Sequence, residues 1–376
     1  MNENELMSSL PVPKAVAKMA IPSVISSLVT VVYNMADIFF VGQTGDPLQV
    51  AAVSLTNPIF ILFMAFANMF GMGGSAAASM AMGEKNEKRM KQVSAFVTYA
   101  SLVVGVALAV ILMVFMTPVL NMFGANEQTF LYAKGYTFHI AYGAPFIIWS
   151  AAASFVVRAE GASKEAMIGI LSGVCVTGLP TAVFSMLMSV STIVLNQILV
   201  AYGNAQVAAI GIVFKANMFI TFLQMGLANG VQPLLGYNYG SGDHKRFVSV
   251  ERYTKKCCVI VGILATALFF VLREPIIRLF ISDGEVVYYG VKMLIAYMLS
   301  GPVIGLLFVN MNCMQSVGNS FPATILSVMR QGLLLIPLLY LLNACMGLNG
   351  VIYGQALTDY AAVILSLLFT GRHFLN

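Results

Sequence analysis

Gly83–Arg89 reads GEKNEKR and Gly240–Arg246 reads GSGDHKR, two polar turns that share a glycine and a Lys-Arg pair at the same spacing. They lie 157 residues apart, and the same offset relates residues 50–161 to residues 207–318. Matched positions along both copies are Pro118 and Pro275, Phe123 and Phe280, Tyr132 and Tyr289, Pro145 and Pro302, and Gly161 and Gly318. Upstream, Pro22 corresponds to Pro180 with a slip of one residue. A spacing held over this length indicates an internal duplication.

The composition excludes a water-soluble domain. Hydrophobic residues make up 59% of the 376 residues, charged residues make up 9%, and the mean hydropathy is +0.86. Soluble domains carry about 25% charged residues. The sequence therefore predicts an all-α integral membrane protein that lies in the lipid bilayer. The net charge of +5 does not indicate a nucleic-acid partner, because the basic residues stand in short loops beside apolar segments.

Ten segments are long and apolar enough to cross a membrane, which requires about 20 residues. The second and sixth are unusually long, which predicts a tilt or a break in each. The ten predicted spans are residues 20–41, 51–82, 93–116, 136–157, 181–202, 207–238, 257–280, 289–314, 322–343 and 348–370.

The loops between the spans predict an orientation. Gly83–Gln92, Arg158–Glu165 and Ser241–Lys256 hold most of the loop Lys and Arg, and all three fall on one side of the membrane. The opposite loops at 42–47 and 282–285 are shorter or acidic. By the positive-inside rule the basic side is cytoplasmic. We therefore expect a multi-pass protein of the cell membrane with both termini in the cytoplasm.

The first copy has four predicted spans and the second has six, so both copies enter the membrane in the same direction and the repeat is parallel. We expect an N-terminal lobe at 1–172, a junction at 173–180 and a C-terminal lobe at 181–376. After Lys164 the first copy offers only Glu165–Gly178, which is 14 residues long and too short for a span. Either two spans are absent from the first half, or two are inserted in the second.

Five segments, in order along the chain, resemble the multidrug and toxic compound extrusion (MATE) family of prokaryotes. They are AIPSVISSLVTVVYNMADIFFVG at 20–42, GLPTAVFSMLMSVSTIVLNQ at 178–197, NGVQPLLGYNYG at 229–240, MQSVGNS at 314–320 and RQGLLLIP at 330–337. The resemblance implies two six-helix lobes around a central cavity, and exchange of cationic drugs or metabolites for H⁺ or Na⁺. This sequence matches helices one to four and seven to twelve of that pattern, and it lacks helices five and six near residues 170–178.

Asp37 is the first candidate for a coupling site. It lies about four residues from the outer end of the first span, roughly 6 Å inside by helical rise. A carboxylate there is costly unless it faces a cavity or binds a cation. Tyr33 and Asn34 share its helical face, so the three could present oxygens to Na⁺ or hold a proton. The resemblance implies the same role for Asp37. The alternative is a hydrated carboxylate at the interface; no other metal site or cofactor is expected.

Arg330 and Asp359 lie at similar depths in two consecutive, antiparallel spans, so they are expected to form an ion pair that lowers the cost of burying each charge. That pair could stabilise the lobe, or Asp359 could bind a cationic substrate. Lys215 lies inside the sixth span and could serve as a movable counter-ion or extend to the surface. Neutral polar residues are predicted to line the substrate cavity or to bond between helices; they are Asn196, Gln197, Asn217, Gln224 and Asn312.

The leading functional prediction is a cation-coupled antiporter, a monomer that exports small lipophilic or cationic compounds by alternating access of two lobes. No GxxxxGK[ST] loop or hydrolase signature is present, so neither ATP-driven transport nor an enzyme is expected. A flippase for lipid-linked oligosaccharides is an alternative, but it would favour a more basic cavity than Lys215 and Arg330 supply. A non-transporting remnant of a transporter is the other alternative, because two spans are missing.

Overall fold

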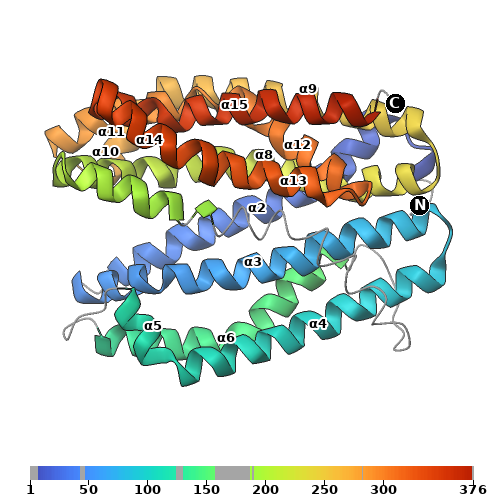
Figure 1. Cartoon of the computed structure of the whole chain (residues 1–376), viewed down its shortest axis with the longest axis horizontal. Helices are drawn as coiled ribbons and strands as arrows, with labels where there is room; N and C mark the ends of the chain where they lie inside the picture. Colours follow the sequence, from blue (N-terminus) through green and yellow to red (C-terminus); the bar gives the residue numbers. More distant parts are fainter. Residues whose placement is uncertain are drawn as a thin grey trace. The chain divides into compact units, whose positions relative to one another are not determined.

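The computed structural model describes residues 7–42, 47–123, 130–156, 187–188, 190–281 and 283–374. These residues form helices joined by short turns, with no strand among them (Figure 1). Their contacts divide the chain into two compact units: unit 1 contains Met1–Val31 and Leu187–Asn376, and unit 2 contains Val32–Met186. Helix α2 (Val12–Gly42) begins in unit 1 and ends in unit 2. The predicted junction at 173–180 lies outside the described residues.

Unit 2 is built on three long apolar helices that pack against one another. Its core holds large apolar side chains from α3 and α6, among them Phe63 and Ile148, which are 1% and 0% exposed. The short α5 extends the hairpin between α4 and α6. The bounds are α3 (Pro47–Gly83), α4 (Glu87–Val114), α5 (Met116–Met122) and α6 (Phe130–Val156).

Unit 1 is organised around α8, which packs against α9, α11 and α12, while α15 packs against α11, α12 and α14. A single large apolar cluster runs through these helices and includes Ile220, Met293 and Leu294. The bounds are α8 (Asn204–Gly240), α9 (His244–Val271), α10 (Arg273–Phe280), α11 (Gly284–Met298), α12 (Gly301–Ser316), α13 (Ser320–Val328), the π-helix η1 (Met329–Leu334), α14 (Leu335–Met346) and α15 (Leu348–Phe374).

The first two long helices of the repeat correspond closely in the two units. Helices α3 and α8 are each 37 residues long, helices α4 and α9 are each 28, and both ends of each pair differ by 157 in residue number. Each copy caps its second helix in the same way: the Asn86 side chain accepts from the Arg89 backbone N–H, and Asp243 accepts from that of Arg246, both at 3.0 Å. The duplication inferred from the sequence is therefore confirmed.

A close backbone approach recurs at equivalent positions of the two copies. A Cβ on Gly105 would lie 2.6 Å from Cα of Pro145, and a Cβ on Gly262 would lie 2.4 Å from the Gly301 carbonyl oxygen and 2.8 Å from Cα of Pro302. At distances this short, a Cβ would force the facing backbone to shift. Glycine at these positions thus lets α4 approach α6, and α9 approach α12.

The helix predicted over 257–280 is interrupted, which corrects that prediction. Helix α9 ends at Val271 and α10 starts at Arg273. Pro275 has no N–H to donate to the Val271 carbonyl and its ring crowds that carbonyl, which favours a break in the α-helix at this turn. The first copy breaks at Phe115, three residues before Pro118, for the same reason.

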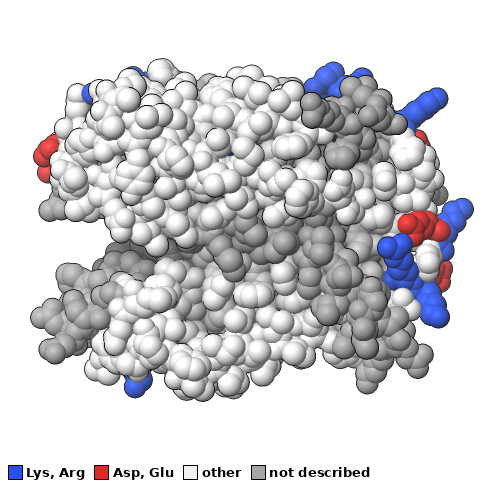
Figure 2. Space-filling model, in the orientation of Figure 1, with Lys and Arg blue, Asp and Glu red and all other residues white. Residues whose placement is uncertain are grey.

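Six helices among the described residues are long and apolar enough to span a membrane: Pro58–Gly83, Glu87–Val114, Ala205–Gly240, His244–Val271, Phe321–Met346 and Leu348–Phe369. A seventh span results if α11 and α12, which are bent by 47°, cross as one. These correspond to seven of the ten predicted spans. The number ten and the four-plus-six division between lobes remain predictions. In Figure 2 the visible face is predominantly uncharged, and charged side chains gather mainly near the ends of the helices.

Candidate functional site: a buried polar centre in unit 1

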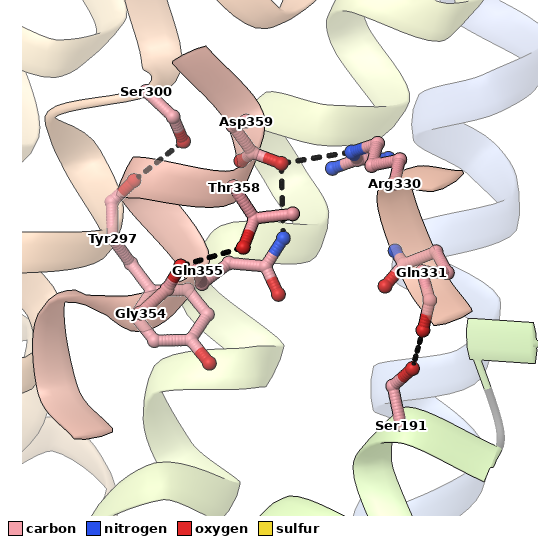
Figure 3. Close-up of polar contacts among 9 residues, drawn as sticks. All are labelled: Ser191, Tyr297, Ser300, Arg330, Gln331, Gly354, Gln355, Thr358 and Asp359. Carbon is pink, nitrogen blue, oxygen red and sulfur yellow. Dashed lines mark hydrogen bonds and ion pairs between the residues drawn. The ribbon is translucent and has the colours of Figure 1, made fainter. Parts of the chain in front are cut away.

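The structure brings Arg330 and Asp359 together in the interior of unit 1. Arg330 donates from Nε to Oδ1 of Asp359 at 2.8 Å, and the two side chains are only 6% and 3% exposed. Figure 3 shows the carboxylate of α15 facing the guanidinium of η1 across the interhelical space. The pair is overall neutral, which offsets part of the cost of burying each charge.

The π-helical turn places two consecutive polar residues in the interior. Arg330 and Gln331 are 5% and 6% exposed, and both belong to η1. A π turn adds one residue to a helical turn, shifts the facing of the residues that follow, and often occurs at functional sites. Arg330 faces Asp359, while the Gln331 carbonyl accepts a hydrogen bond from Ser191 of the helix Val190–Val200 (Figure 3).

The ion pair has further partners. Gln355, one turn before Asp359 on α15, donates from Nε2 to the same Oδ1 at 2.9 Å. The Arg330 guanidinium carbon lies 5.8 Å from the centre of the Phe308 ring on α12, within cation–π range. Arginine stays protonated at any physiological pH. A cationic ligand at Asp359 would therefore have to compete with Arg330 for the carboxylate.

Amide side chains form a second polar contact, between α8 and α12. Asn312 donates to Oδ1 of Asn229 at 3.0 Å, and Gln232 donates to Oε1 of Gln315 at 3.2 Å. Each helix supplies two of these residues three positions apart, so the two amide pairs are stacked about one helical turn apart. Interhelical amide bonds of this kind hold membrane helices together, which favours a packing role for Asn312.

Gln224, a predicted cavity residue, is completely buried and ties three elements together. It donates from Nε2 to the carbonyls of Cys258 on α9 at 2.9 Å and Gly301 on α12 at 3.2 Å. Its Oε1 has no hydrogen-bond partner in the part of the chain that the structure describes. The donors of Gln224 therefore hold α9 and α12 against α8, close to the Gly262–Pro302 contact.

The other predicted site residues are not among the described partners of the ion pair. Lys215 is half-buried and its ammonium lies 5.9 Å from the Phe280 ring, a position suited to cation–π stabilisation. Asn196 and Asn217 are half-buried, and Gln197 is exposed. Helix α2 includes Tyr33, Asn34 and Asp37, but the structure does not describe their side chains. Among described residues, no group of three or more His, Cys, Asp or Glu could hold a metal ion.

The partners that complete the polar centre were not predicted from the sequence. Gln355 could have been predicted, since it stands four residues before Asp359 and such pairs share a helical face. Asn229 and Gln232 stand at the same spacing as Asn312 and Gln315, but a register between two helices is not encoded in either segment alone. The π turn has a weak signal in Gly332, and the Ser191 contact has none.

The comparison with protein families gives the same doubled organisation. The MatE family model matches the chain twice, over residues 22–184 and 180–341. The two matches start 158 residues apart and end 157 apart, as the internal repeat does.

Curated relatives match over nearly their whole length. The chain is 26% identical over 420 aligned residues to the multidrug export protein MepA of Staphylococcus saprophyticus, which covers 94% of this chain and 92% of that protein. It is 28% identical to MepA of Staphylococcus haemolyticus, with the same coverage. Its identity to MepA of Staphylococcus aureus is 26%, over 96% of this chain and 95% of the relative.

Solved structures share the fold at lower identity. A crystal structure of MATE in complex with MaD3S superposes with a TM-score of 0.91 at 18% identity, over 100% of this chain and 98% of the other. An outward-facing multidrug resistance MATE transporter gives 0.90 at 18% identity. Together with the two matches to the family model, which extend from residue 22 to residue 341, this shows that the chain belongs to the MatE family and is a transporter rather than an enzyme.

Proposed function

We propose that this chain is a multidrug exporter of the cell membrane, which moves small lipophilic or cationic compounds outward in exchange for H⁺ or Na⁺. The observation that carries the proposal is the alignment with multidrug export proteins over 92% of their length. The doubled helical organisation supports it, because secondary transporters with parallel repeats alternate access by movement of one half against the other. The charged loops described above favour cytoplasmic termini, and we expect the chain to act as a monomer.

Asp37 is the residue we propose for ion coupling, with Tyr33 and Asn34 on the same face of α2 as additional oxygen ligands. The geometry of unit 1 supports this choice indirectly. Asp359 already accepts hydrogen bonds from Arg330 and Gln355, so its carboxylate is committed to neutralising a buried guanidinium. A coupling carboxylate must instead exchange its cation in each cycle, which a residue near the end of a span can do more readily.

Four of the predicted cavity residues keep their proposed role in substrate contact: Asn196, Gln197, Lys215 and Asn217. A lipophilic cation needs a mainly apolar surface with a few polar groups, and these side chains are at least partly exposed in unit 1. Gln224 and Asn312 are better assigned to helix packing, because their amide donors are engaged by neighbouring helices.

We also propose that the family's helices five and six have no counterpart in this chain. The alignment with MepA of Staphylococcus saprophyticus occupies 420 positions, which is more than the 376 residues of the chain. Some residues of MepA must therefore be aligned with gaps in this chain. We locate these gaps at the short stretch Glu165–Gly178. The N-terminal lobe would then have four helices and the C-terminal lobe six.

An accumulation assay tests export. Cells depleted of their own exporters would express the chain, and their content of ethidium, a fluorescent lipophilic cation, would be measured. We expect lower ethidium in cells that express the parent and a return to background with Asp37→Asn. Asp243→Asn is the matched control, since it makes the same chemical change at an exposed helix cap. Unchanged accumulation with well-folded parent would contradict the proposal and favour the non-transporting remnant.

A further inference from the structure

A shallow, open pocket of about 250 Å³ lies in the first half of α9, on the side of the helix that faces the beginning of α2. It is lined by Val12, Ser249, Arg252, Tyr253 and Lys256. Arg252 and Lys256 are both exposed and stand one helical turn apart, so their cationic groups belong to the same face. The polar centre described above uses none of these residues.

Charge is divided unequally between two neighbouring faces of α9. Glu251 and Lys255, one turn apart, pair with each other and are 10% and 19% exposed. Arg252 and Lys256 stand one residue further along and have the same spacing, but neither has an ion-pair partner among the described residues. The first pair is therefore neutral and turned toward the protein, whereas the second leaves two positive charges on the pocket wall.

The N-terminal segment is fixed against this region. Arg246 donates from Nε to the Met7 carbonyl at 3.1 Å and from Nη2 to the Leu10 carbonyl at 2.6 Å. Asn238 adds a longer contact of 3.4 Å to the Met7 carbonyl. These hydrogen bonds hold the start of α2 beside α9 and so place Val12 as the apolar wall of the pocket.

The same face of α9 continues from the cations into an exposed apolar stripe. Ile260, Ile263 and Leu264 are 57%, 51% and 64% exposed, and they follow Lys256 at intervals of one and two helical turns. Helix α9 is one of the helices that are long and apolar enough to span a membrane. The cations thus stand where the polar end of a span meets its lipid-facing part, at the depth of phospholipid headgroups.

The equivalent positions of the first copy show that the fold does not require these cations. Gln92, Ala95, Phe96 and Tyr99 occupy the positions of Ser249, Arg252, Tyr253 and Lys256. Ala95 and Phe96 are 5% and 3% exposed. The shared helix therefore folds without a basic pair here, and the pocket is particular to the second copy.

We propose that this pocket binds the phosphate of an anionic phospholipid, with the headgroup between Arg252 and Lys256 and an acyl chain along Ile260, Ile263 and Leu264. Guanidinium and ammonium groups are the phosphate ligands of choice in proteins. The Ser249 hydroxyl donates to the Lys245 carbonyl, so it can only accept, and the two cations supply the attraction. A free phosphate would use the same cations but would gain nothing from the apolar stripe.

Native mass spectrometry of the purified full-length chain tests the proposal. Phosphatidylglycerol would be titrated into detergent-solubilised protein, and the bound lipid would be counted for the parent and for the double variant Arg252→Gln/Lys256→Gln. A basic residue at a membrane surface contributes about fivefold to the affinity for anionic lipid, so we expect roughly thirtyfold weaker binding in the double variant. Lys88→Gln/Lys91→Gln is the matched control, since it removes two exposed cations at the start of the equivalent helix α4.

Binding that is unchanged in the Arg252/Lys256 variant, or reduced equally in the control, would overturn the proposal. Two further arms separate a lipid from a soluble ion. Ile260→Ser/Ile263→Ser is expected to weaken phosphatidylglycerol binding, and neutral phosphatidylcholine is expected to bind equally to the parent and to the Arg252→Gln/Lys256→Gln variant. Displacement of the lipid by glycerol phosphate at an equal concentration would instead assign the pocket to a free phosphate. Size-exclusion chromatography would verify that each variant is folded.

Discussion

Arg330 and Asp359 meet between η1 and α15, with Nε 2.8 Å from Oδ1 and both side chains excluded from solvent. Two opposite charges on neighbouring helices neutralise each other, and Arg330 belongs to the π-helical turn. Within unit 1 the two charges pair with each other, which favours a structural role for this contact over a free cation site.

Removal of one partner of this pair is expected to destabilise unit 1 strongly. Asp359→Asn leaves the Arg330 guanidinium buried without a counter-charge, at a cost of about 3–5 kcal/mol. The double variant Arg330→Met/Asp359→Leu removes both charges and is expected to recover most of this loss. The measurement is thermal unfolding of the purified variants in detergent.

The exposed pair of α10 serves as the control for that experiment. Arg278 and Glu274 are 55% and 57% exposed at a similar distance of 2.9 Å. Arg278→Gln is expected to change stability by no more than about 1 kcal/mol, because solvent screens exposed pairs. If Asp359→Asn unfolds at the same temperature as Arg278→Gln, the assignment of Arg330 and Asp359 as a buried ion pair is wrong.

The glycine contacts predict a steric effect that recurs in both copies. Gly262→Ala would push a methyl group into the Gly301 carbonyl and Pro302, and Gly105→Ala would push one into Pro145. Each should cost about 1–3 kcal/mol, as overpacking does. Gly211→Ala on α8, where a Cβ meets nothing within 4 Å, is expected to be neutral or stabilising. Equal melting temperatures for the three variants would contradict this packing.

The equivalent helix caps should be interchangeable. Asp243→Ala removes the acceptor of the Arg246 N–H and should cost about 1 kcal/mol, whereas Asp243→Asn should keep the cap, because Asn86 fills that role in the first copy. Unfolding of the two variants in denaturant compares them directly. A loss in Asp243→Asn as large as in Asp243→Ala would show that the charge, and not the hydrogen bond, stabilises this helix.

Arg246 should control the order of the N-terminal segment. Arg246→Gln removes the donors to the Met7 and Leu10 carbonyls, so hydrogen exchange at residues 7–11 should accelerate. Lys245→Gln is the control, because Lys245 is exposed and its side chain makes no ion pair within the described residues. Equal exchange in both variants would contradict the role of Arg246.

Much of this fold could be predicted from local sequence. Apolar length gives the spans, and the offset of 157 residues relates α3 to α8 and α4 to α9. Intramembrane charges are few, so Arg330 and Asp359 could be matched by depth alone. Two features escaped prediction for different reasons. The Asn229–Asn312 bond depends on the register of α8 on α12, which neither segment encodes alone. The break at Leu272 is local, but Pro275 had to be weighed against an otherwise apolar run.

Coupled flux tests the proposed function most directly. Purified protein in liposomes would be given a proton gradient and then a sodium gradient, and transport of ethidium would be followed for the parent, Asp37→Asn and Asp243→Asn. We predict that one of the two gradients drives flux in the parent and in Asp243→Asn, and that Asp37→Asn abolishes it. Gradient-driven flux that persists in Asp37→Asn would contradict Asp37 as the coupling residue, and no flux from folded parent protein would contradict antiport itself.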